Sequence, residues 1–256
     1  VVGLMNVQFA VKKEDGKHNV YVLEVNPRAS RTIPFVAKAT GVPIAKIAAK
    51  VMVGEKLADL EFTSTPIPKH VSIKESVFPF RKFAGVDIVL GPEMRSTGEV
   101  MGISERFSLA FAKSQLAAGV VLPEKGEGKI FLSVTGRHKE IIKDLARRLA
   151  KMGYELIATE GTAQSLEEES IPVAHVKKIA EGHPNLIDYL IDGKVALALN
   201  TPNGKGARTD EGRIRAAAVQ YGVPCITTIQ AAEAAVTAME ALQEEDMAVL
   251  ALQDRF

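Results

Sequence analysis

From residue 130 onward, short apolar runs alternate with amphipathic segments, and this alternation constrains the fold more than any other feature of the sequence. Apolar runs of strand length stand at residues 130–134, 154–158, 173–176, 195–199 and 225–228. Segments with helical spacing follow them at residues 137–152, 163–169, 185–191, 210–221 and 231–243. This order favours a parallel, doubly wound sheet of about five strands. Such sheets bind their ligands beyond the carboxyl ends of the strands.

The beginning of the chain has a different pattern. Residues 7–11 and 20–25 alternate in polarity like paired strands, and Asp15-Gly16 between them is a hairpin signal. Residues 34–53 have the spacing of a helix that stops at Gly54. A strand-like run that starts so close to Val1 needs neighbouring strands, so we expect this chain to be part of a longer protein.

The middle of the chain is less regular. Residues 61–102 hold four prolines, with short strand candidates between them. A second helix is expected at residues 104–118, and the Gly-, Glu- and Lys-rich stretch at 119–128 is typical of a linker. Length and composition together predict two domains, residues 1–121 and residues 122–256.

Composition excludes several classes of protein. Hydrophobic residues make up 46% and charged residues 25%, which is ordinary globular usage and excludes a disordered chain. The net charge of +1 gives no cationic field for nucleic acid or an anionic membrane, so neither partner is expected. The chain has a single cysteine and no apolar run of about 20 residues. We therefore expect a cytoplasmic protein without an internal disulfide.

A first group of polar residues stands on the two amino-terminal strands. Glu24 and Asn26 are two residues apart and so project from the same face of a strand. Carboxylate and amide oxygens are ligands that Mg²⁺ prefers, and Gln8 on the paired strand could complete the set. Arg28, just beyond Pro27, supplies a cation for a phosphate. From the spacing alone, an ordinary surface ion pair of Glu24 and Arg28 at a strand end is the favoured interpretation.

Two longer strings in the sequence carry a family resemblance. The stretch Glu24-Val25-Asn26-Pro27-Arg28 and its continuation through Thr32 resemble the carboxyl-terminal signature of an ATP-grasp domain. The extension through Pro43, with a second block at residues 90–102, resembles the large subunit of carbamoyl phosphate synthetase. The resemblance implies an α/β fold: a partial ATP-grasp (α+β) segment, then a doubly wound parallel-sheet domain similar to methylglyoxal synthase.

The resemblance also implies roles for the first group. Gln8, Glu24 and Asn26 would hold Mg or Mn, Gln8 and Glu24 would contact the substrate ATP, and Arg28 would be catalytic, stabilising the transferred phosphoryl group. The whole enzyme of this family is a ligase of arginine and pyrimidine biosynthesis that works with a glutaminase small subunit. This part of it would serve the carbamate phosphorylation step and carry the allosteric domain. An isolated fragment is expected to be inactive.

A second group of polar residues follows the strands of the predicted sheet. Its members carry hydroxyl, amide or ammonium groups, or a glycine backbone that a phosphate can approach: Ser133, Lys139, Thr159, Gly161, Thr162, Lys178, Asn200 and Thr201. Such residues are often only helix caps. The resemblance implies instead an allosteric site for a nucleotide monophosphate, in an oligomeric enzyme. Pro202 replaces a usual threonine, which puts one hydroxyl contact in doubt.

The resemblance implies a further effector site for ornithine. Glu75 matches the family's carboxylate for the ornithine amine, and Thr227 matches a hydroxyl near the other end of the ligand. Cys225 stands where the family often has a tyrosine, so weak or absent ornithine activation is expected. Cys225 in its apolar strand is otherwise most simply a buried thiol.

Two other functions remain open. A free-standing lyase is one, because methylglyoxal synthase has a related domain, but residues 135–137 lack the His and Asp that its chemistry needs. A passive oligomerisation or nucleotide-binding module is the other. The histidines His138, His175 and His183 have no ligand spacing for zinc, and no Walker-type phosphate loop is present.

Overall fold

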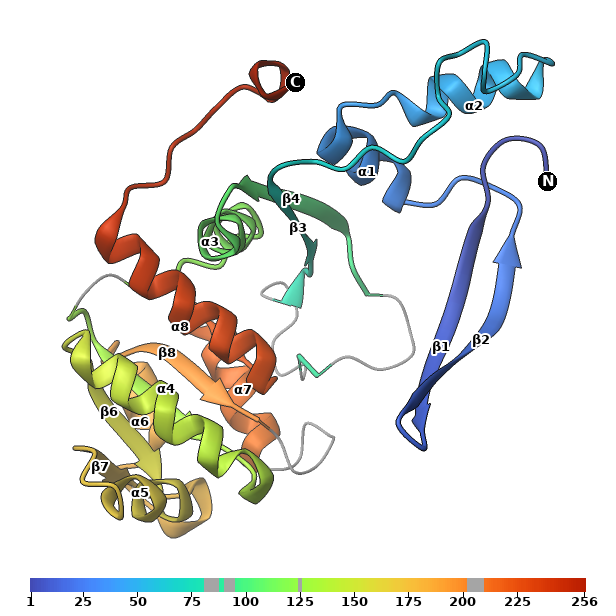
Figure 1. The fold of residues 1–256 in the computed structure, drawn as a ribbon. Coiled ribbons are helices and arrows are strands. Elements are labelled where there is room, and N and C mark those ends of the chain that lie inside the picture. The colour runs from blue at the N-terminus through green and yellow to red at the C-terminus, as the bar shows by residue number, and fades with distance from the viewer. Residues whose placement is uncertain (81–87, 90–94, 124–125, 202–209) are drawn as a thin grey trace. The chain divides into compact units, whose positions relative to one another are not determined.

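The computed structural model describes residues 1–80, 88–89, 95–123, 126–201 and 210–256 (Figure 1). Two compact units divide the chain: Val1–His70 with Ala248–Phe256, and Val71–Met247. The functional boundary expected between residues 121 and 122 stays a prediction. Pro202 lies outside the described residues, as do residues 90–94 of the second family block.

The first unit begins with an antiparallel hairpin, as the sequence predicts. Strand β1 (Asn6–Glu14) pairs with β2 (Lys17–Asn26). The turn between them needs positive φ at both central residues, and Asp15 (50°) and Gly16 (77°) supply it. The register shifts between Gln8 and Phe9, which makes a bulge beside the Gln8–Glu24 pair. Bulges of this kind re-aim side chains and occur often next to functional sites.

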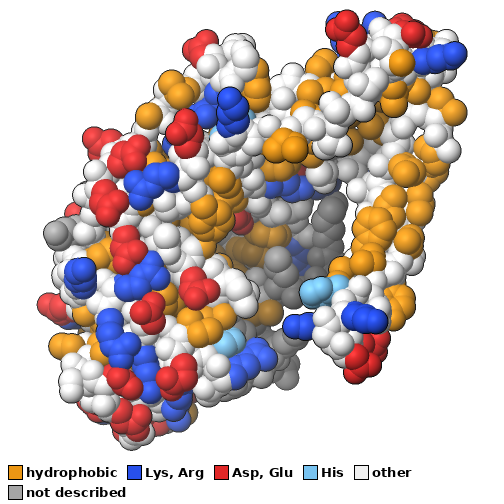
Figure 2. All heavy atoms as spheres, in the orientation of Figure 1, with side chains coloured by type: hydrophobic (Ala, Val, Ile, Leu, Met, Phe, Trp, Pro, Cys, Tyr) orange, Lys and Arg blue, Asp and Glu red, His pale blue; other side chains and the backbone are white. Residues whose placement is uncertain are grey.

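The hairpin exposes apolar side chains on both of its faces. Figure 2 shows these hydrophobic side chains along the ribbon of β1 and β2. Among them, Phe9, Val11, Val22 and Leu23 are each more than half exposed. A two-stranded ribbon has little stability of its own in water. Apolar side chains on both faces are typical of a sheet that other elements cover on both sides.

The helix predicted over residues 34–53 is two helices. Helix α1 (Thr32–Thr40) ends at Gly41, whose φ of 73° forms a left-handed cap, and α2 (Ile44–Met52) begins after Pro43. The prediction of one helix was wrong because its spacing ignored this Gly-Val-Pro break. Gly41 has a second role, since a Cβ there would stand 2.6 Å from the ring of Phe256. Phe256 follows the short helix η4 (Leu252–Arg255) at the end of the chain.

The second unit opens with an antiparallel ribbon and a helix. Strands β3 (Val71–Val77) and β4 (Gly98–Ser104) pair, and α3 (Phe107–Ala117) packs on them. Gly102 permits this packing, because a Cβ there would come within 2.0 Å of the Ala110 carbonyl oxygen. The helix predicted at 104–118 is therefore confirmed from residue 107, while Ser104 ends a strand.

The predicted five-stranded parallel sheet is confirmed. Its strands are β5 (Lys129–Ser133), β6 (Glu155–Thr159), β7 (Ala174–Val176), β8 (Val195–Asn200) and β9 (Cys225–Ile226). Their order is β7-β6-β5-β8-β9, all parallel. The connecting helices are η2 (Gly136–His138), α4 (Lys139–Lys151), α5 (Glu160–Glu167), η3 (Ile179–Glu181), α6 (Leu186–Ile191), α7 (Asp210–Gln220) and α8 (Ile229–Glu244). The fold class predicted for this part of the chain is thus correct.

Helices cover both faces of the sheet (Figure 1). Ile130 and Leu132 of β5 pack with residues of α3, α4, α5 and α8, whereas Phe131 packs on the other face with residues of α6 and α7. The strand order reverses direction between β5 and β8, which is the point where ligands of such sheets bind. Among the described residues, none of the helices combines the length and the apolar character needed to cross a bilayer.

Candidate functional site

Three polar side chains stand in register across the carboxyl ends of β6, β5 and β8. Ser133 pairs with Asn200, and Thr159 follows the pair formed by Ala158 and Leu132. The Thr159 Oγ1 lies 3.3 Å from the Ser133 Oγ. We call Thr159, Ser133 and Asn200 the polar row. It continues the otherwise apolar layer under α6 and α7, at the point where the strand order reverses.

The amino terminus of α5 lies directly beside the polar row. The helix begins at Glu160, three residues earlier than predicted, so Gly161 and Thr162 belong to its first turn. Thr159 has the extended backbone of an N-cap, but its side chain makes no capping bond. Apart from its chain neighbours and its own helix backbone, a Cβ on Gly161 would meet none of the described atoms within 4 Å, so packing does not require the glycine. This first turn can offer backbone N–H groups to an anion.

Thr162 links α5 to the end of β5. The side chain is buried, and its Oγ1 accepts a hydrogen bond from the Val134 backbone N–H at 3.2 Å. The hydroxyl proton of Thr162 can still be donated.

The other predicted residues of this group lie around the polar row rather than in it. Lys178 is exposed at the start of η3, with its Nζ 3.8 Å from Glu181 Oε1, and Lys139 opens α4. Thr201 is buried, and its Oγ1 accepts the Thr135 backbone N–H at 3.3 Å and lies 3.1 Å from His138 Nδ1. Thr201 is therefore engaged inside the protein.

Sequence reasoning missed Arg215. This arginine of α7 has no exposed surface, and its Nη1 donates to Asn200 Oδ1 at 3.2 Å. The sequence nevertheless indicates that Arg215 is buried. It lies beside Ile214 and three residues before Ala218, on the apolar side of its helix. A charged residue in an apolar stripe indicates a specific partner.

A second residue that the sequence analysis set aside, His175, also lies near the site. Its Nδ1 lies 2.8 Å from Glu160 Oε2 and its Nε2 lies 2.7 Å from Glu167 Oε1. These two carboxylates raise the pKa of His175, the Glu160 bond more than the Glu167 bond. The same contact lowers the pKa of Glu160. The bridge joins β7 to α5, so it helps to hold the first turn of α5 in place.

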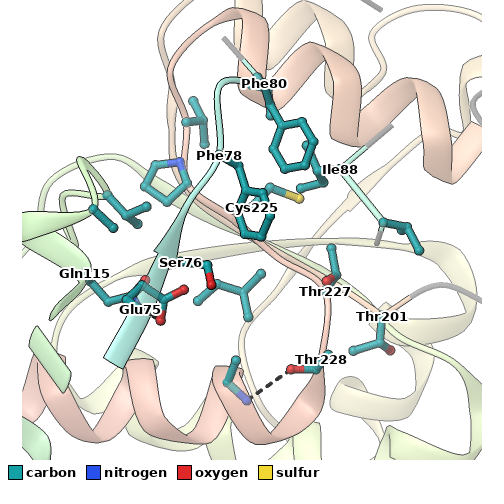
Figure 3. A pocket seen from close by; sticks show the side chains of 18 of the residues that line it. Glu75, Ser76, Phe78, Phe80, Ile88, Gln115, Thr201, Cys225, Thr227 and Thr228 are labelled. Atoms are coloured by element: carbon teal, nitrogen blue, oxygen red, sulfur yellow. Dashed lines mark hydrogen bonds between the residues drawn. The ribbon is translucent and has the colours of Figure 1, made fainter. Parts of the chain in front are cut away.

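Glu75 and Thr227 line one cavity of the second unit, with a volume of about 1220 Å³ (Figure 3). Glu75 lies at one end beside Gln115, whose Nε2 donates to it at 3.0 Å. Burial raises the pKa of Glu75, and this bond to Gln115 opposes the rise. Thr227, Thr228 and Thr201 lie toward the other end. The cavity thus joins a desolvated carboxylate to a group of hydroxyls.

Aromatic and sulfur-bearing side chains line the wall between these two ends. Phe78 and Phe80 stack with their ring centres 5.1 Å apart, and Cys225 stands beside them (Figure 3). Cys225 is only partly buried, so the prediction of a buried thiol was wrong. The reason is its place in β9, an edge strand that faces the cavity.

The first group of predicted residues comes together on the hairpin of the first unit. Gln8 Nε2 and Asn26 Nδ2 both donate to Glu24 Oε1, each at 2.7 Å. Arg28 lies beyond the strand end, where its Nη1 donates to the carbonyl oxygen of Ala29. Three side chains with hard oxygen atoms therefore meet on an exposed surface. Among the described residues, no cluster of three or more His, Cys, Asp or Glu side chains has the arrangement of a metal site.

Comparisons with known proteins agree with both parts of this geometry. A family model described as "Carbamoyl-phosphate synthase L chain, ATP binding domain" matches residues 1–60, and one described as "MGS-like domain" matches residues 141–227. The class is thus a segment of an ATP-binding synthase domain joined to a domain similar to methylglyoxal synthase.

Individual relatives name the protein family. The chain is 68% identical over its whole length to the carbamoyl phosphate synthase large chain of Rhodopirellula baltica, of which it covers 24%. It is 53% identical over 99% of its length to the large chain of Myxococcus xanthus, covering 23% of that protein. It is 49% identical, again over 99% of its length, to a "C-terminal section" of the large chain of Methanocaldococcus jannaschii, covering 42%.

These matches confirm the resemblance. The chain belongs with the carbamoyl phosphate synthase large chains and corresponds to their carboxyl-terminal part. It spans about a quarter of the length of the first two relatives.

Proposed function

We propose that this chain is the carboxyl-terminal portion of a glutamine-hydrolysing carbamoyl phosphate synthase large subunit, an ATP-dependent ligase. In that enzyme it contributes residues to ATP-dependent carbamate phosphorylation and supplies an allosteric effector domain. The observation that carries the proposal is the identity of 68% over all 256 residues with a large chain. The enzyme is cytoplasmic and oligomeric, works with a glutaminase small subunit, and serves arginine and pyrimidine biosynthesis.

The hairpin residues fit a divalent cation. Glu24 offers a carboxylate, and Gln8 and Asn26 offer amide oxygens, which are the oxygen donors that Mg²⁺ and Mn²⁺ prefer. Both amides now donate N–H to Glu24, so binding a cation requires them to turn their oxygens toward it. A divalent cation held by these residues would neutralise charge on the phosphates of ATP. Gln8 and Glu24 also contact ATP, and Arg28 stabilises the transferred phosphoryl group through its guanidinium.

The polar row and the residues around it form the effector site for a nucleotide monophosphate. Support comes from the convergence of Thr159, Ser133 and Asn200 at the strand ends, next to the open first turn of α5. Gly161, Thr162 and the ammonium groups of Lys139 and Lys178 add donors for a phosphate. Thr201 acts through the loop that it holds, because its hydroxyl is already bonded to the protein.

The cavity beside this site binds a ligand with an amine, such as ornithine. Its affinity is lower than in relatives that have a tyrosine in place of Cys225. Glu75 would bind the amine and Thr227 the opposite end. The Cys225 thiol is a weak donor and is smaller than a phenol. A cavity of about 1220 Å³ leaves a void that ornithine does not fill.

A lyase function is not favoured. Residues 135–137, where methylglyoxal synthase carries its His and Asp, are Thr135, Gly136 and Arg137. The carboxylate of Glu181, at the end of η3, accepts the Lys178 backbone N–H at 2.9 Å and so serves as a helix cap. Proton abstraction needs a free carboxylate within reach of the substrate.

A chimaeric large chain tests the proposal. This chain would replace the matching 24% of the Rhodopirellula baltica large chain, and carbamoyl phosphate synthesis would be measured with the small subunit. We expect glutamine-dependent synthesis that responds to uridine or inosine monophosphate. A correctly folded chimaera without synthesis would contradict the catalytic part. Synthesis that no nucleotide alters would contradict the effector part and favour a passive module.

A further inference from the structure

Arg215 and Asn200 form a fully buried contact beneath the effector site. Arg215 lies in α7, Asn200 ends β8, and neither exposes surface to solvent. Nη1 of Arg215 donates to Oδ1 of Asn200 at 3.2 Å. Burying a guanidinium costs free energy, so a buried arginine needs specific partners, and Asn200 is one partner of Arg215.

The chemistry of this contact determines which way the Asn200 amide faces. A guanidinium group carries five N–H donors and no acceptor, so the amide atom that faces Arg215 has to be the oxygen. The amide nitrogen Nδ2 therefore faces elsewhere; it is buried, and among the residues that the structure describes it has no hydrogen-bond partner. Nearly all buried polar atoms have a partner, so this N–H₂ group indicates that a ligand supplies an acceptor.

Two other residues of the proposed effector site also offer donors. The hydroxyl of Thr162 accepts from the Val134 backbone, which leaves its proton for donation, and the ammonium of Lys178 can only donate. With Asn200 held as a donor, these groups match the oxygens of a phosphoryl group, which can only accept when fully ionised. A neutral hydroxyl group carries a proton of its own, so it would accept fewer hydrogen bonds from these donors than a phosphoryl group does.

We propose that Arg215 is a positioning residue of the effector site. It holds Asn200 as an obligate donor and so selects an anionic phosphoryl oxygen at the end of β8. The inference rests on the proposed function of the polar row as a nucleotide monophosphate site. Arg215 acts through Asn200 and does not touch the ligand.

Three variants separate the orientation of the Asn200 amide from the packing around it. Asn200→Asp keeps an oxygen toward Arg215, turns the contact into an ion pair and removes the donor. We expect an unchanged or higher Tm, with an affinity for uridine or inosine monophosphate at least about a hundredfold lower. Arg215→Gln can donate or accept, so the Asn200 amide is free to turn, and affinity should fall about tenfold. Arg215→Lys, which can only donate, is the matched control and should stay close to the unmodified chain.

Calorimetry on the 256-residue chain measures these affinities, with uridine as the probe that lacks a phosphate. If the unmodified chain binds the monophosphates and Asn200→Asp binds them equally well, the role of Arg215 and Asn200 is refuted while the effector site stands. If the unmodified chain binds neither monophosphate, the proposed function itself fails.

A second measurement does not depend on the stability of Arg215 variants. The side-chain ¹⁵N–¹H₂ signals of Asn200 in the unmodified chain should shift when a monophosphate is added and should not shift with uridine. Binding by calorimetry without any change in these signals would overturn the inference.

Discussion

Gln8 and Glu24 lie opposite each other on the antiparallel hairpin, and Gln8 Nε2 donates to Glu24 Oε1 at 2.7 Å. The bulge that follows Gln8 is part of this geometry, because it changes the register between this pair and the rest of the hairpin. The donor set at the end of the hairpin is thus built by backbone pairing rather than by a buried core.

Glu24→Gln in the chimaeric synthase should lower carbamate phosphorylation by about a hundredfold or more, because the cation loses its charged ligand. The fold should remain intact, since Glu24 is exposed and glutamine can still accept from Gln8 and Asn26. Partial-reaction kinetics with carbamoyl phosphate and ADP would measure the effect. Glu14→Gln, at the other end of the hairpin, is the matched control and should keep full activity. Equal activity of the two variants would refute the metal-ligand role.

The 256-residue polypeptide alone should not synthesise carbamoyl phosphate. Phosphoryl transfer depends on positioning and charge stabilisation, and only residues 1–60 of this chain match the ATP-binding family model. The predicted ligands also lie on the exposed surface of the hairpin. The measurement is ATP-dependent product formation from bicarbonate and ammonia; turnover near that of the chimaera would contradict this expectation.

The His175 bridge should make stability depend on pH. Because its folded-state pKa is raised above the ordinary 6.5, its contribution is full below that pH and is lost as pH rises through the folded-state value. His175→Gln should therefore lower Tm slightly, by about a degree or two, at pH 6 and have little effect at high pH. Thermal unfolding across pH 5–9 measures this. His183→Gln leaves the bridge between β7 and α5 intact and should keep the slope; a slope that persists in His175→Gln would argue against the bridge.

Cys225→Tyr should strengthen the response to ornithine. A phenol fills the void beside Phe78 and Phe80 and adds a stronger donor between Glu75 and Thr227. Carbamoyl phosphate synthesis by the chimaera, measured against ornithine concentration, decides the point. Strong activation of the unmodified chimaera at micromolar ornithine would show that the cavity needs no tyrosine. Cys225→Val adds no donor and serves as the control.

Strand and helix periodicity predicted the carboxyl-terminal sheet well, because each strand there is a short run of buried apolar residues. It failed at residues 34–53, where Gly41 and Pro43 break a continuous apolar spacing. Spacing also could not show that β3 and β4 pair across a long intervening segment, because that pairing is a tertiary contact.

The candidate sites were predicted unevenly for a related reason. Gln8, Glu24 and Asn26 could be recognised because strand pairing alone brings them together. Arg215 and His175 could not, because their roles arise from packing between elements distant from the strand ends that carry the motif.

The central claim is that the second unit binds a nucleotide monophosphate through the polar row and the first turn of α5. Thr162→Val removes a charge-assisted hydrogen bond worth roughly 1.5–3 kcal/mol, so affinity should fall about ten- to a hundredfold. Thr162→Ser keeps the hydroxyl and is the control. Because Val134 also loses its acceptor in Thr162→Val, Tm has to be recorded for each variant.

Calorimetric titration of the 256-residue chain with uridine and inosine monophosphate is the most direct test of this claim. We predict measurable heat of binding to the unmodified chain at millimolar nucleotide, retained in Thr162→Ser and much weakened in Thr162→Val. The absence of heat with both nucleotides, from a chain that unfolds cooperatively, would contradict it.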